Sequence, residues 1–282
     1  MQREHNSTRK LKMLVTDLDG TLKYGPEISK SDRNFLLKLG EKKILRAIAT
    51  GRNLYSARKI LPPAFPIDYL IFSSGAGIMH WSTQGLLQSY SLNPTEVQQT
   101  LEVLCKFNLD FTIQDPIPEN HFFYFRDSGK PNPDFQRRCK LYQEFSKPWD
   151  RRKARLRKAS QFLAIESFAD GEELFEKIKP SCPGLKVIRT TSPLDFKSTW
   201  IEIFPDSVSK ASAAQWLANK HSISSADICA LGNDYNDLDL LNWAGHSFAV
   251  PNSAPELIEK YRTIYRDNRS SIATQLQSYF KL

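Results

Sequence analysis

The chain has 282 residues, of which 40% are hydrophobic and 25% charged, and its formal net charge is +8. These proportions exclude a fibrous or low-complexity chain. No window approaches the roughly 18 consecutive apolar residues that a membrane-spanning helix needs, so we expect no membrane partner. The length allows a medium α/β domain carrying a second domain of about 100 residues.

The first twelve residues are polar and basic and lack the apolar stretch of a secretory signal. We interpret residues 1–12 as a disordered basic tail. The four cysteines are far apart and show neither the paired spacing of a zinc site nor the density of a disulfide scaffold. We therefore expect a cytoplasmic protein.

Three short apolar runs follow the tail, separated by helical patterns. Residues 13–16, 44–49 and 69–72 have the composition of buried parallel strands, and each ends in a polar or Gly-containing cluster. Residues 29–39 and 53–61 predict helices between them. This alternation predicts a doubly wound, Rossmann-like parallel sheet, in which ligands bind beyond the carboxyl ends of the strands.

The rhythm changes from about residue 78. Helical and strand-like segments are then interleaved, namely helices at 95–107 and 171–179 and strands at 111–113, 122–125, 162–165 and 186–188. Residues 200–204 are interpreted as the return to the first domain, because a helix at 210–221 and strands at 228–231 and 248–250 then resume the doubly wound pattern. We therefore predict a core domain of residues 13–77 and 200–282, with an inserted α+β domain of residues 78–199.

Two carboxylates follow the first predicted strand. Asp17 and Asp19 are two residues apart, so their side chains point the same way and can converge on one cation. Hard oxygen ligands of this kind suit Mg²⁺, which keeps room for a phosphate oxygen. With a cation and a lysine to offset negative charge, one carboxylate can attack a phosphate monoester and form an aspartyl phosphate. The other can protonate the leaving oxygen and then activate water.

Four motifs in chain order resemble those of the haloacid dehalogenase (HAD) superfamily of phosphatases. The segment DLDGT at 17–21 is similar to the first, whose two acids are the nucleophile and the acid/base. Thr50, in ATGR, resembles the second, whose hydroxyl binds the phosphoryl group. Lys210 resembles the third, which orients the nucleophile and offsets charge. The segment GNDYND at 232–237 resembles the fourth, acidic metal-binding motif.

The resemblance implies a role for each matched residue. The catalytic residues would be Asp17 and Asp19, with Mg²⁺ as cofactor. The residues that bind the phosphoryl group would be Leu18, Thr50, Gly51, Lys210 and Asn236. The residues that contact the rest of the substrate would be Arg52, Ser74 and Gly75.

One position departs from the family pattern. The fourth motif usually reads Gly-Asp, whereas this chain has Asn233 followed by Asp234. Asparagine can ligate Mg²⁺ through its amide oxygen, although without charge. A shift of the loop could instead bring in Asp234, and Asp237 could bind the metal or position Lys210. The predicted metal ligands are therefore Asp17 and Asp19 with a choice among Asn233, Asp234 and Asp237.

The inserted domain resembles the α/β cap of the Cof-type subfamily, IIB, which includes sucrose-phosphate and phosphomannose phosphatases. The resemblance implies a small phosphorylated metabolite, often a sugar phosphate, over which the cap closes. Two alternatives stay open. A phosphomutase needs the same two acids, but those mutases generally carry a helical cap soon after the first motif. A catalytically silent sugar-phosphate-binding regulator would explain Asn233.

A basic segment, residues 126–158, contains twelve Lys or Arg against four acids and accounts for the whole net charge. It could draw in an anionic substrate or form a solvated face. Its aromatic residues fit the buried side of an amphipathic helix better than a stacking platform for bases. We therefore do not expect a nucleic-acid partner. The sequence carries no coiled-coil heptads or other assembly signature, so it does not indicate an oligomeric state.

Overall fold

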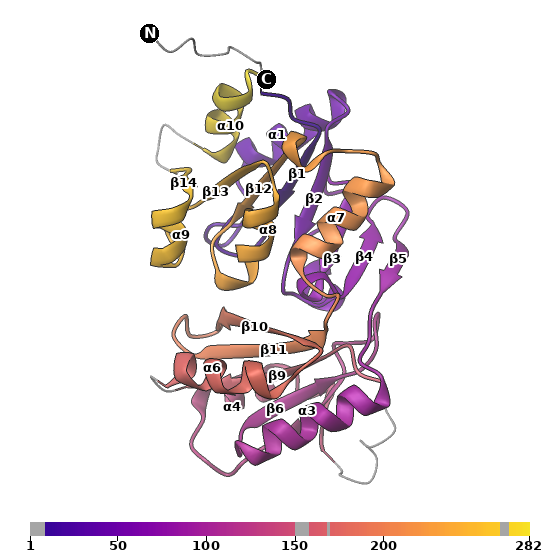
Figure 1. Cartoon of the computed structure of the whole chain (residues 1–282). Coiled ribbons are helices and arrows are strands. Elements are labelled where there is room, and N and C mark those ends of the chain that lie inside the picture. Colours follow the sequence, from indigo (N-terminus) through magenta and orange to yellow (C-terminus); the bar gives the residue numbers. More distant parts are fainter. Residues whose placement is uncertain (1–8, 150–157, 168–169, 266–270) are drawn as a thin grey trace.

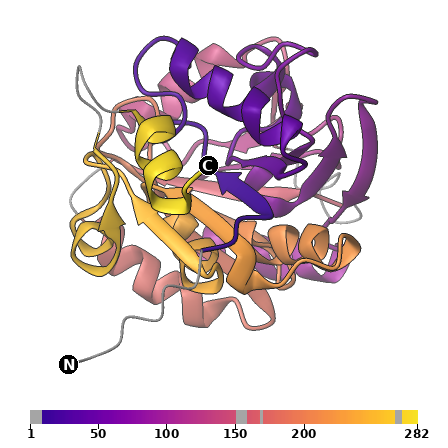
Figure 2. The ribbon, with the colours of Figure 1, turned by 90° about the horizontal axis from the view of Figure 1, so that it is seen from above.

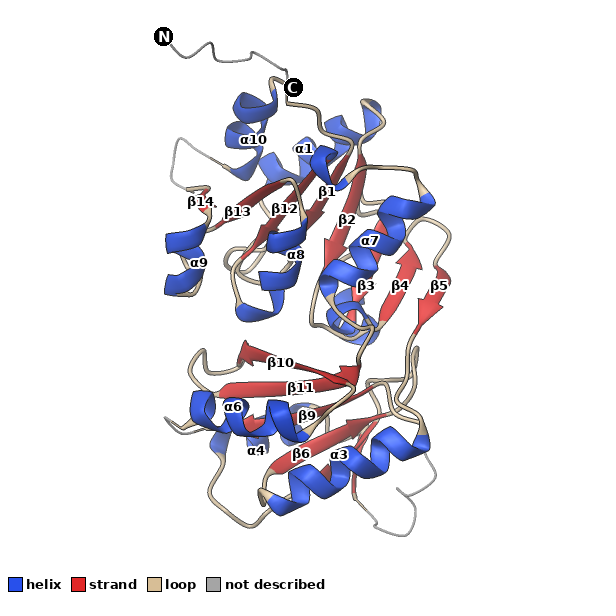
Figure 3. Cartoon of the chain, viewed as in Figure 1, coloured by secondary structure: helices blue, strands red, loops and turns tan. Residues whose placement is uncertain are grey.

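The computed structural model describes residues 9–149, 158–167, 170–265 and 271–282. Its strands form two separate sheets, one of eight strands and one of six, which lie one above the other in Figure 1. Helices pack against both sheets (Figure 3). We call the eight-stranded sheet with its helices the larger unit and the six-stranded sheet with its helices the smaller unit. The architecture is the predicted α/β fold, with a mainly parallel sheet in the larger unit.

The eight-stranded sheet has the order β14-β13-β12-β1-β2-β3-β4-β5. Its parallel strands are β1 (Met13–Thr16), β2 (Leu45–Ala49), β3 (Tyr69–Phe72), β12 (Ile228–Gly232), β13 (His246–Ala249) and β14 (Arg262–Thr263). The antiparallel strands at one edge are β4 (Gly77–His80) and β5 (Gly85–Ser89). Because β1 pairs with both β2 and β12, the first, second and fourth motifs follow neighbouring strands.

Alternate residues of β1 show why this strand is a continuous apolar run. Leu14 belongs to a core cluster with one set of helices, α1 (Lys30–Glu41), α2 (Leu54–Arg58) and α10 (Ile272–Phe280). Met13 and Val15 belong to a second cluster with α7 (Lys210–Lys220), α8 (Leu238–Trp243) and α9 (Pro255–Lys260). Figure 2 shows indigo α1 and yellow α10 on one side of the sheet and orange α7 on the other. Both faces of the sheet are therefore buried, as in doubly wound folds.

The six-stranded sheet has the order β10-β11-β9-β6-β7-β8. Its strands are β6 (Asp110–Gln114), β7 (Phe123–Arg126), β8 (Ser146–Pro148), β9 (Gln161–Glu166), β10 (Leu185–Thr191) and β11 (Thr199–Pro205). Phe162 and Ile201 pack on one face with α3 (Pro94–Lys106) and α6 (Gly171–Ser181). Leu163 and Trp200 pack on the other face, against Phe135 of α4 (Pro133–Leu141). The alternation of side chains along each strand thus gives the sheet two different faces.

Two segments lie in a different sheet from the one expected. Residues 77–89 form β4 and β5, which extend the eight-stranded sheet, although residues 78–199 were expected to form the inserted domain. Residues 199–205 form β11, which pairs with β9 and β10 of the six-stranded sheet rather than returning to the core. The reason is local pairing, because each segment pairs with the strand that precedes it closely in the chain, β4 with β3 and β11 with β10. The side chains of β11 also alternate between the two faces of the six-stranded sheet.

The start of the described chain is also more ordered than a tail. Leu11 is buried, and the Lys12 amide donates a 2.8 Å hydrogen bond to the Asp227 carbonyl. Residues 1–8 of the predicted tail lie outside the described residues. No helix among the described residues is long and apolar enough to cross a membrane. The described part of the chain also forms three short 3₁₀ turns, Ser73–Gly75 (η1), Ser225–Asp227 (η2) and Tyr235–Asp237 (η3).

Candidate active site

A cavity of about 810 Å³ lies between the carboxyl edge of the eight-stranded sheet and the six-stranded sheet. The wall from the larger unit includes the predicted site residues Asp17, Asp19, Thr50, Gly51, Arg52, Asn233, Asp234 and Asn236. The opposite wall includes Gln114, Asn120, Arg138, Tyr142, Trp200 and Glu202. The cavity is thus closed by residues from both units, and its floor is the edge at which doubly wound sheets bind ligands.

Lys210 connects the third motif to the first and the fourth. It is the first residue of α7 and is buried, and its Nζ lies 2.7 Å from Asp17 Oδ1 and 2.6 Å from Asp237 Oδ1. The same Nζ donates to Asn236 Oδ1 at 3.2 Å. One buried ammonium group is therefore shared between two buried carboxylates, an arrangement in which the loss of the lysine would leave both charges uncompensated.

The electrostatics of Asp17 follow from its burial. Desolvation raises the pKa of the Asp17 carboxyl to about 7, although the Lys210 ammonium acts in the opposite direction. The carboxylates of Asp237 and Asp19 add to the increase. A further positive charge beside Asp17 would favour the ionised form that a nucleophile needs.

Asp19 lies on the same side of the cavity but has a different partner. Arg52 binds this carboxylate through one edge of its guanidinium group: Nε donates to Oδ2 at 2.6 Å, and Nη2 donates to Oδ1 at 2.8 Å. Thr50 is buried at the end of β2, where its hydroxyl accepts a hydrogen bond from the Arg52 amide. Gly20 turns the chain out of the site with φ of +78°, and a Cβ there would lie 2.8 Å from the Asn233 amide.

The loop after β12 divides its acids between two tasks. Asp237 is fully buried, and its Oδ2 accepts hydrogen bonds from the amides of Asn233 and Asp234 while its Oδ1 contacts Lys210. Asp234 points to the other unit instead. Its carboxylate accepts from the Thr190 hydroxyl at 2.7 Å and from the Thr191 amide at 2.7 Å.

The donor atoms nearest Asp17 fit a small hard cation. One terminal atom of the Asn233 amide lies 3.2 Å from Asp17 Oδ2, 3.1 Å from the Asp19 carbonyl oxygen and 2.9 Å from Thr21 Oγ1. As an NH₂ group, this atom has two hydrogens to share among these three acceptors. As an oxygen, it lies 3.2 Å from Asp17 Oδ2 and 3.1 Å from the Asp19 carbonyl oxygen, close to the spacing of adjacent ligands around Mg²⁺ with bonds of about 2.1 Å. Acids, histidines and cysteines alone form no cluster of three or more suited to a metal among the described residues, so this donor set includes the Asn233 amide and a backbone carbonyl oxygen.

Besides buried Lys210, three of the predicted contact residues do not line the cavity. Leu18 is buried in the core of the larger unit. Ser74 is buried behind the wall and donates a 2.7 Å hydrogen bond to Glu202. Gly75 packs against the chain before Lys210, where a Cβ would lie 2.2 Å from the Ser209 carbonyl oxygen. These residues support the site rather than forming its surface.

The opposite wall contains polar residues that the motifs did not reveal. Gln161 and Glu202 extend from the cavity face of β9 and β11, between apolar residues of the other face. Asn120 donates a 2.7 Å hydrogen bond to Ser73 and so joins the two units. The sequence indicates Gln161 and Glu202 only weakly, because each is a polar residue next to a run of apolar residues in its strand.

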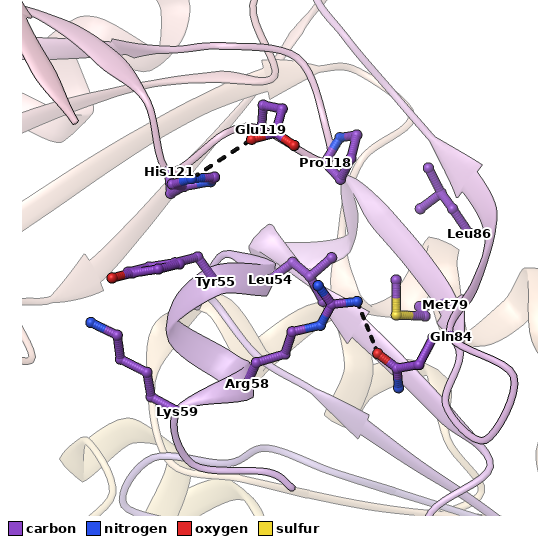
Figure 4. A pocket seen from close by; sticks show the side chains of 10 residues that line it. All are labelled: Leu54, Tyr55, Arg58, Lys59, Met79, Gln84, Leu86, Pro118, Glu119 and His121. Carbon is purple, nitrogen blue, oxygen red and sulfur yellow. Dashed lines mark hydrogen bonds and ion pairs between the residues drawn. The ribbon is translucent and has the colours of Figure 1, made fainter. Parts of the chain in front are cut away.

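A second, smaller cavity of about 450 Å³ lies beside α2 (Figure 4). In it Tyr55 stacks on His121, with ring centroids 4.9 Å apart, and Arg58 donates to Gln84. Its walls contain none of the four motifs. The larger cavity is therefore the candidate active site.

Comparison with known proteins agrees with this arrangement. The family model of haloacid dehalogenase-like hydrolases matches residues 14–276. The match covers both units and all four motifs. The chain belongs to this family of hydrolases.

Relatives narrow the class. The 5-amino-6-(5-phospho-D-ribitylamino)uracil phosphatase YwtE of Bacillus subtilis is 24% identical over 92% of this chain and 94% of its own. The HMP-PP phosphatase of Cronobacter sakazakii is 25% identical over 86% and 85%. The structure of the HAD subclass IIB sugar phosphatase BT4131 superposes with a TM-score of 0.74 at 17% identity, over 96% of this chain and 100% of that one. The chain is accordingly a phosphoric monoester hydrolase of the haloacid dehalogenase-like family, and it shares the fold of the IIB sugar phosphatase.

Proposed function

We propose that the protein is a Mg²⁺-dependent phosphatase that hydrolyses a small phosphorylated metabolite, with a sugar phosphate as the leading class, through a phosphoryl group carried on Asp17. The observation that carries the proposal is the contact between buried Lys210 and Asp17, at the carboxyl edge of the sheet and on the floor of a cavity. This contact fixes one carboxylate oxygen and leaves the other, Oδ2, on the side of Asn233.

The residues of the chain divide the reaction between them. Asp17 attacks phosphorus, and the Thr50 hydroxyl and Lys210 bind the oxygens of the transferring group, so that the charge that develops on them is offset. Asp19 gives its proton to the leaving oxygen and then takes one from the water that hydrolyses the aspartyl phosphate. The fork of Arg52 orients the Asp19 carboxylate for both steps.

Asp17, the Asp19 carbonyl oxygen and Asn233 would hold the metal. When bound, Mg²⁺ supplies positive charge that reduces repulsion between the phosphate and the anionic nucleophile. Asp237 acts through Lys210 and through the amides of the loop, and Asp234 acts at the junction with the smaller unit. We propose that this smaller unit is a cap that closes over the substrate and excludes water.

The names of relatives support a small polar substrate without fixing it. One solved neighbour is described as a sugar phosphatase, and one curated relative acts on a phosphorylated ribitylamino-uracil. These compounds share a phosphate on a small hydroxylated body. The 810 Å³ cavity, with amide and carboxyl groups on its far wall, fits this class.

The test is release of phosphate from p-nitrophenyl phosphate with Mg²⁺, after chelation, and after Mg²⁺ is restored. We expect turnover only with the metal, and a loss of at least 10³-fold in Asp17→Asn. Asp68→Asn, at an ion pair remote from the cavity, is the matched control. A folded Asp17→Asn variant with undiminished turnover would refute the assignment. Binding of sugar phosphates without release by the wild-type protein would support a silent regulator instead.

A further inference from the structure

One cation in the cavity takes no part in the proposed chemistry. Arg138 belongs to α4 and lines the wall opposite Asp17. Its Nε is buried and has no hydrogen-bond partner. Among the described residues no carboxylate lies within ion-pair distance of its guanidinium group. By contrast, Arg52 of the cavity wall is paired with Asp19, and buried Lys210 is paired with Asp17. The third cation of the lining, Lys59, lies over the Tyr55 ring.

Aromatic rings hold this guanidinium group in place. Its central carbon lies 5.4 Å from the ring centroid of Phe123, 5.3 Å from that of Tyr142 and 5.0 Å from that of Trp200. Such contacts orient the group and leave its N–H donors for another partner. Burial lowers the pKa of Arg138, which reflects the cost of keeping an unpaired charge away from water. An anion bound at its edge would remove that cost.

The buried carboxylates nearby accept hydrogen bonds from other donors, although Asp134 Oδ1 has no hydrogen-bond partner among the described residues. Asp134 accepts a 2.7 Å hydrogen bond from the Trp200 indole. Glu202 accepts from Ser74 at 2.7 Å and from Gln161 at 3.5 Å. Both act on the charge of Arg138 only from beyond ion-pair distance. None of the described residues is therefore an ion-pair partner of Arg138, and an anion bound in the cavity can be one.

The same wall also offers unused acceptors. The side-chain oxygens of Gln114 and Asn120 are buried and have no hydrogen-bond partner among the described residues, and both residues line the cavity. A buried acceptor without a donor destabilises the empty site, and a ligand hydroxyl or N–H group can supply the missing hydrogen bond. The wall therefore combines one site for an anion with two for donors.

We propose that Arg138 binds a second anionic group of the substrate, a carboxylate or a second phosphate, while Gln114 and Asn120 accept hydrogen bonds from its hydroxyl groups. This inference rests on the proposed function of the Asp17 site. It narrows the substrate from phosphorylated metabolites in general to hydroxylated compounds with two anionic ends, namely phosphorylated sugar acids or sugar bisphosphates. Arg138 is in this account a specificity residue, not a catalytic one.

The test compares substrates that differ only in the second anion. The first pair is 6-phosphogluconate and sorbitol 6-phosphate, which tests a carboxylate on the same open chain, and the second is fructose 1,6-bisphosphate and fructose 6-phosphate, which tests a phosphate. We expect wild-type kcat/KM to favour the doubly anionic member of one pair by tenfold or more. In Arg138→Met this ratio should fall toward one, and Arg138→Lys, which keeps the charge but not the fork, should retain part of it.

Lys140→Met, which removes an exposed charge from the same helix, is the matched control and should leave the ratio unchanged. The inference is overturned if the wild-type enzyme hydrolyses p-nitrophenyl phosphate but prefers neither doubly anionic compound. It is also overturned if Arg138→Met lowers both members of a pair equally, because Arg138 would then act on the reacting phosphate. Calorimetric titration of the same pairs into Asp17→Asn gives the preference without turnover, so failure of the proposed chemistry would be recognised separately.

Discussion

At the scale of single residues, the floor of the cavity consists of side chains that follow the ends of neighbouring strands, with buried Lys210 in contact with Asp17. Asp17, Thr50 and Lys210 could be placed because each follows or begins an element that any doubly wound sheet brings to the same edge. For the acids of the fourth motif, the sequence left open whether Asp237 binds the metal or positions Lys210, and it did not indicate a partner for Asp234. Asp237 pairs with Lys210 and Asp234 with Thr190, and these partners come from distant parts of the chain.

The departure at Asn233 has a measurable consequence for metal binding. We expect Asn233→Asp to add a charged ligand beside Asp17 and to lower the Mg²⁺ concentration for half-maximal activity by on the order of tenfold. Without metal, the new carboxylate would repel Asp17 and lower the Tm. Thermal unfolding with and without Mg²⁺ would therefore show a larger metal-dependent increase in Tm than in the wild type.

Asn252→Asp, at the same cavity wall, controls for the added charge. An unchanged Mg²⁺ requirement in Asn233→Asp would exclude residue 233 from the metal site.

At the scale of elements, fully buried strands were the easiest to predict. The bounds of β1 and β3 agree with the predicted segments because both strands are continuous apolar runs that end in polar clusters. The assignment of β11 to the core was wrong, because apolar content alone does not show with which sheet a strand pairs. Trp200 and Glu202 of β11 both line the cavity. In the sequence, their spacing of two residues indicates only that they share one face of a strand.

The start of α7 depends on a close approach to η1. Gly75 has φ of +109°, and a Cβ there would lie 2.2 Å from the Ser209 carbonyl oxygen, just before Lys210. We expect Gly75→Ala to reduce the free energy of unfolding by about 2–4 kcal/mol, through backbone strain and the clash. Because the clash moves the helix that carries Lys210, turnover should also fall.

Gly25→Ala is the control, since Gly25 has φ of +87° with open space around it. Urea denaturation should show a loss of about 1 kcal/mol there, from the backbone conformation alone. Equal losses in the two variants would contradict the packing role of Gly75.

At the scale of the whole molecule, the two units meet where the loop after β12 contacts β10 of the proposed cap. The Asp234 carboxylate bridges them through Thr190 and Thr191. We expect Asp234→Ala to favour an open arrangement of the two units and to lower kcat/KM by up to about tenfold. Hydrogen bonds to a charged group contribute about 1.5–3 kcal/mol, and exposure of these bonds to solvent reduces that contribution. The Mg²⁺ concentration for half-maximal activity should not change.

Asp195→Ala provides the comparison, because the hydrogen bonds that the structure describes for Asp195 lie within its own loop, to Lys197 and Ser198. A large rise in the Mg²⁺ requirement of Asp234→Ala would show instead that Asp234 ligates the metal.

The most direct test of the central claim is to find the phosphoryl group on the protein. Asp19→Asn should accumulate it, because p-nitrophenol leaves without a proton whereas hydrolysis of the aspartyl phosphate needs the base. After rapid quenching of this variant with p-nitrophenyl phosphate and Mg²⁺, peptide mass spectrometry should show phosphate on Asp17 and none when Asp17 is also replaced by Asn. Phosphate on a different residue, or turnover by Asp17→Asn, would contradict the account.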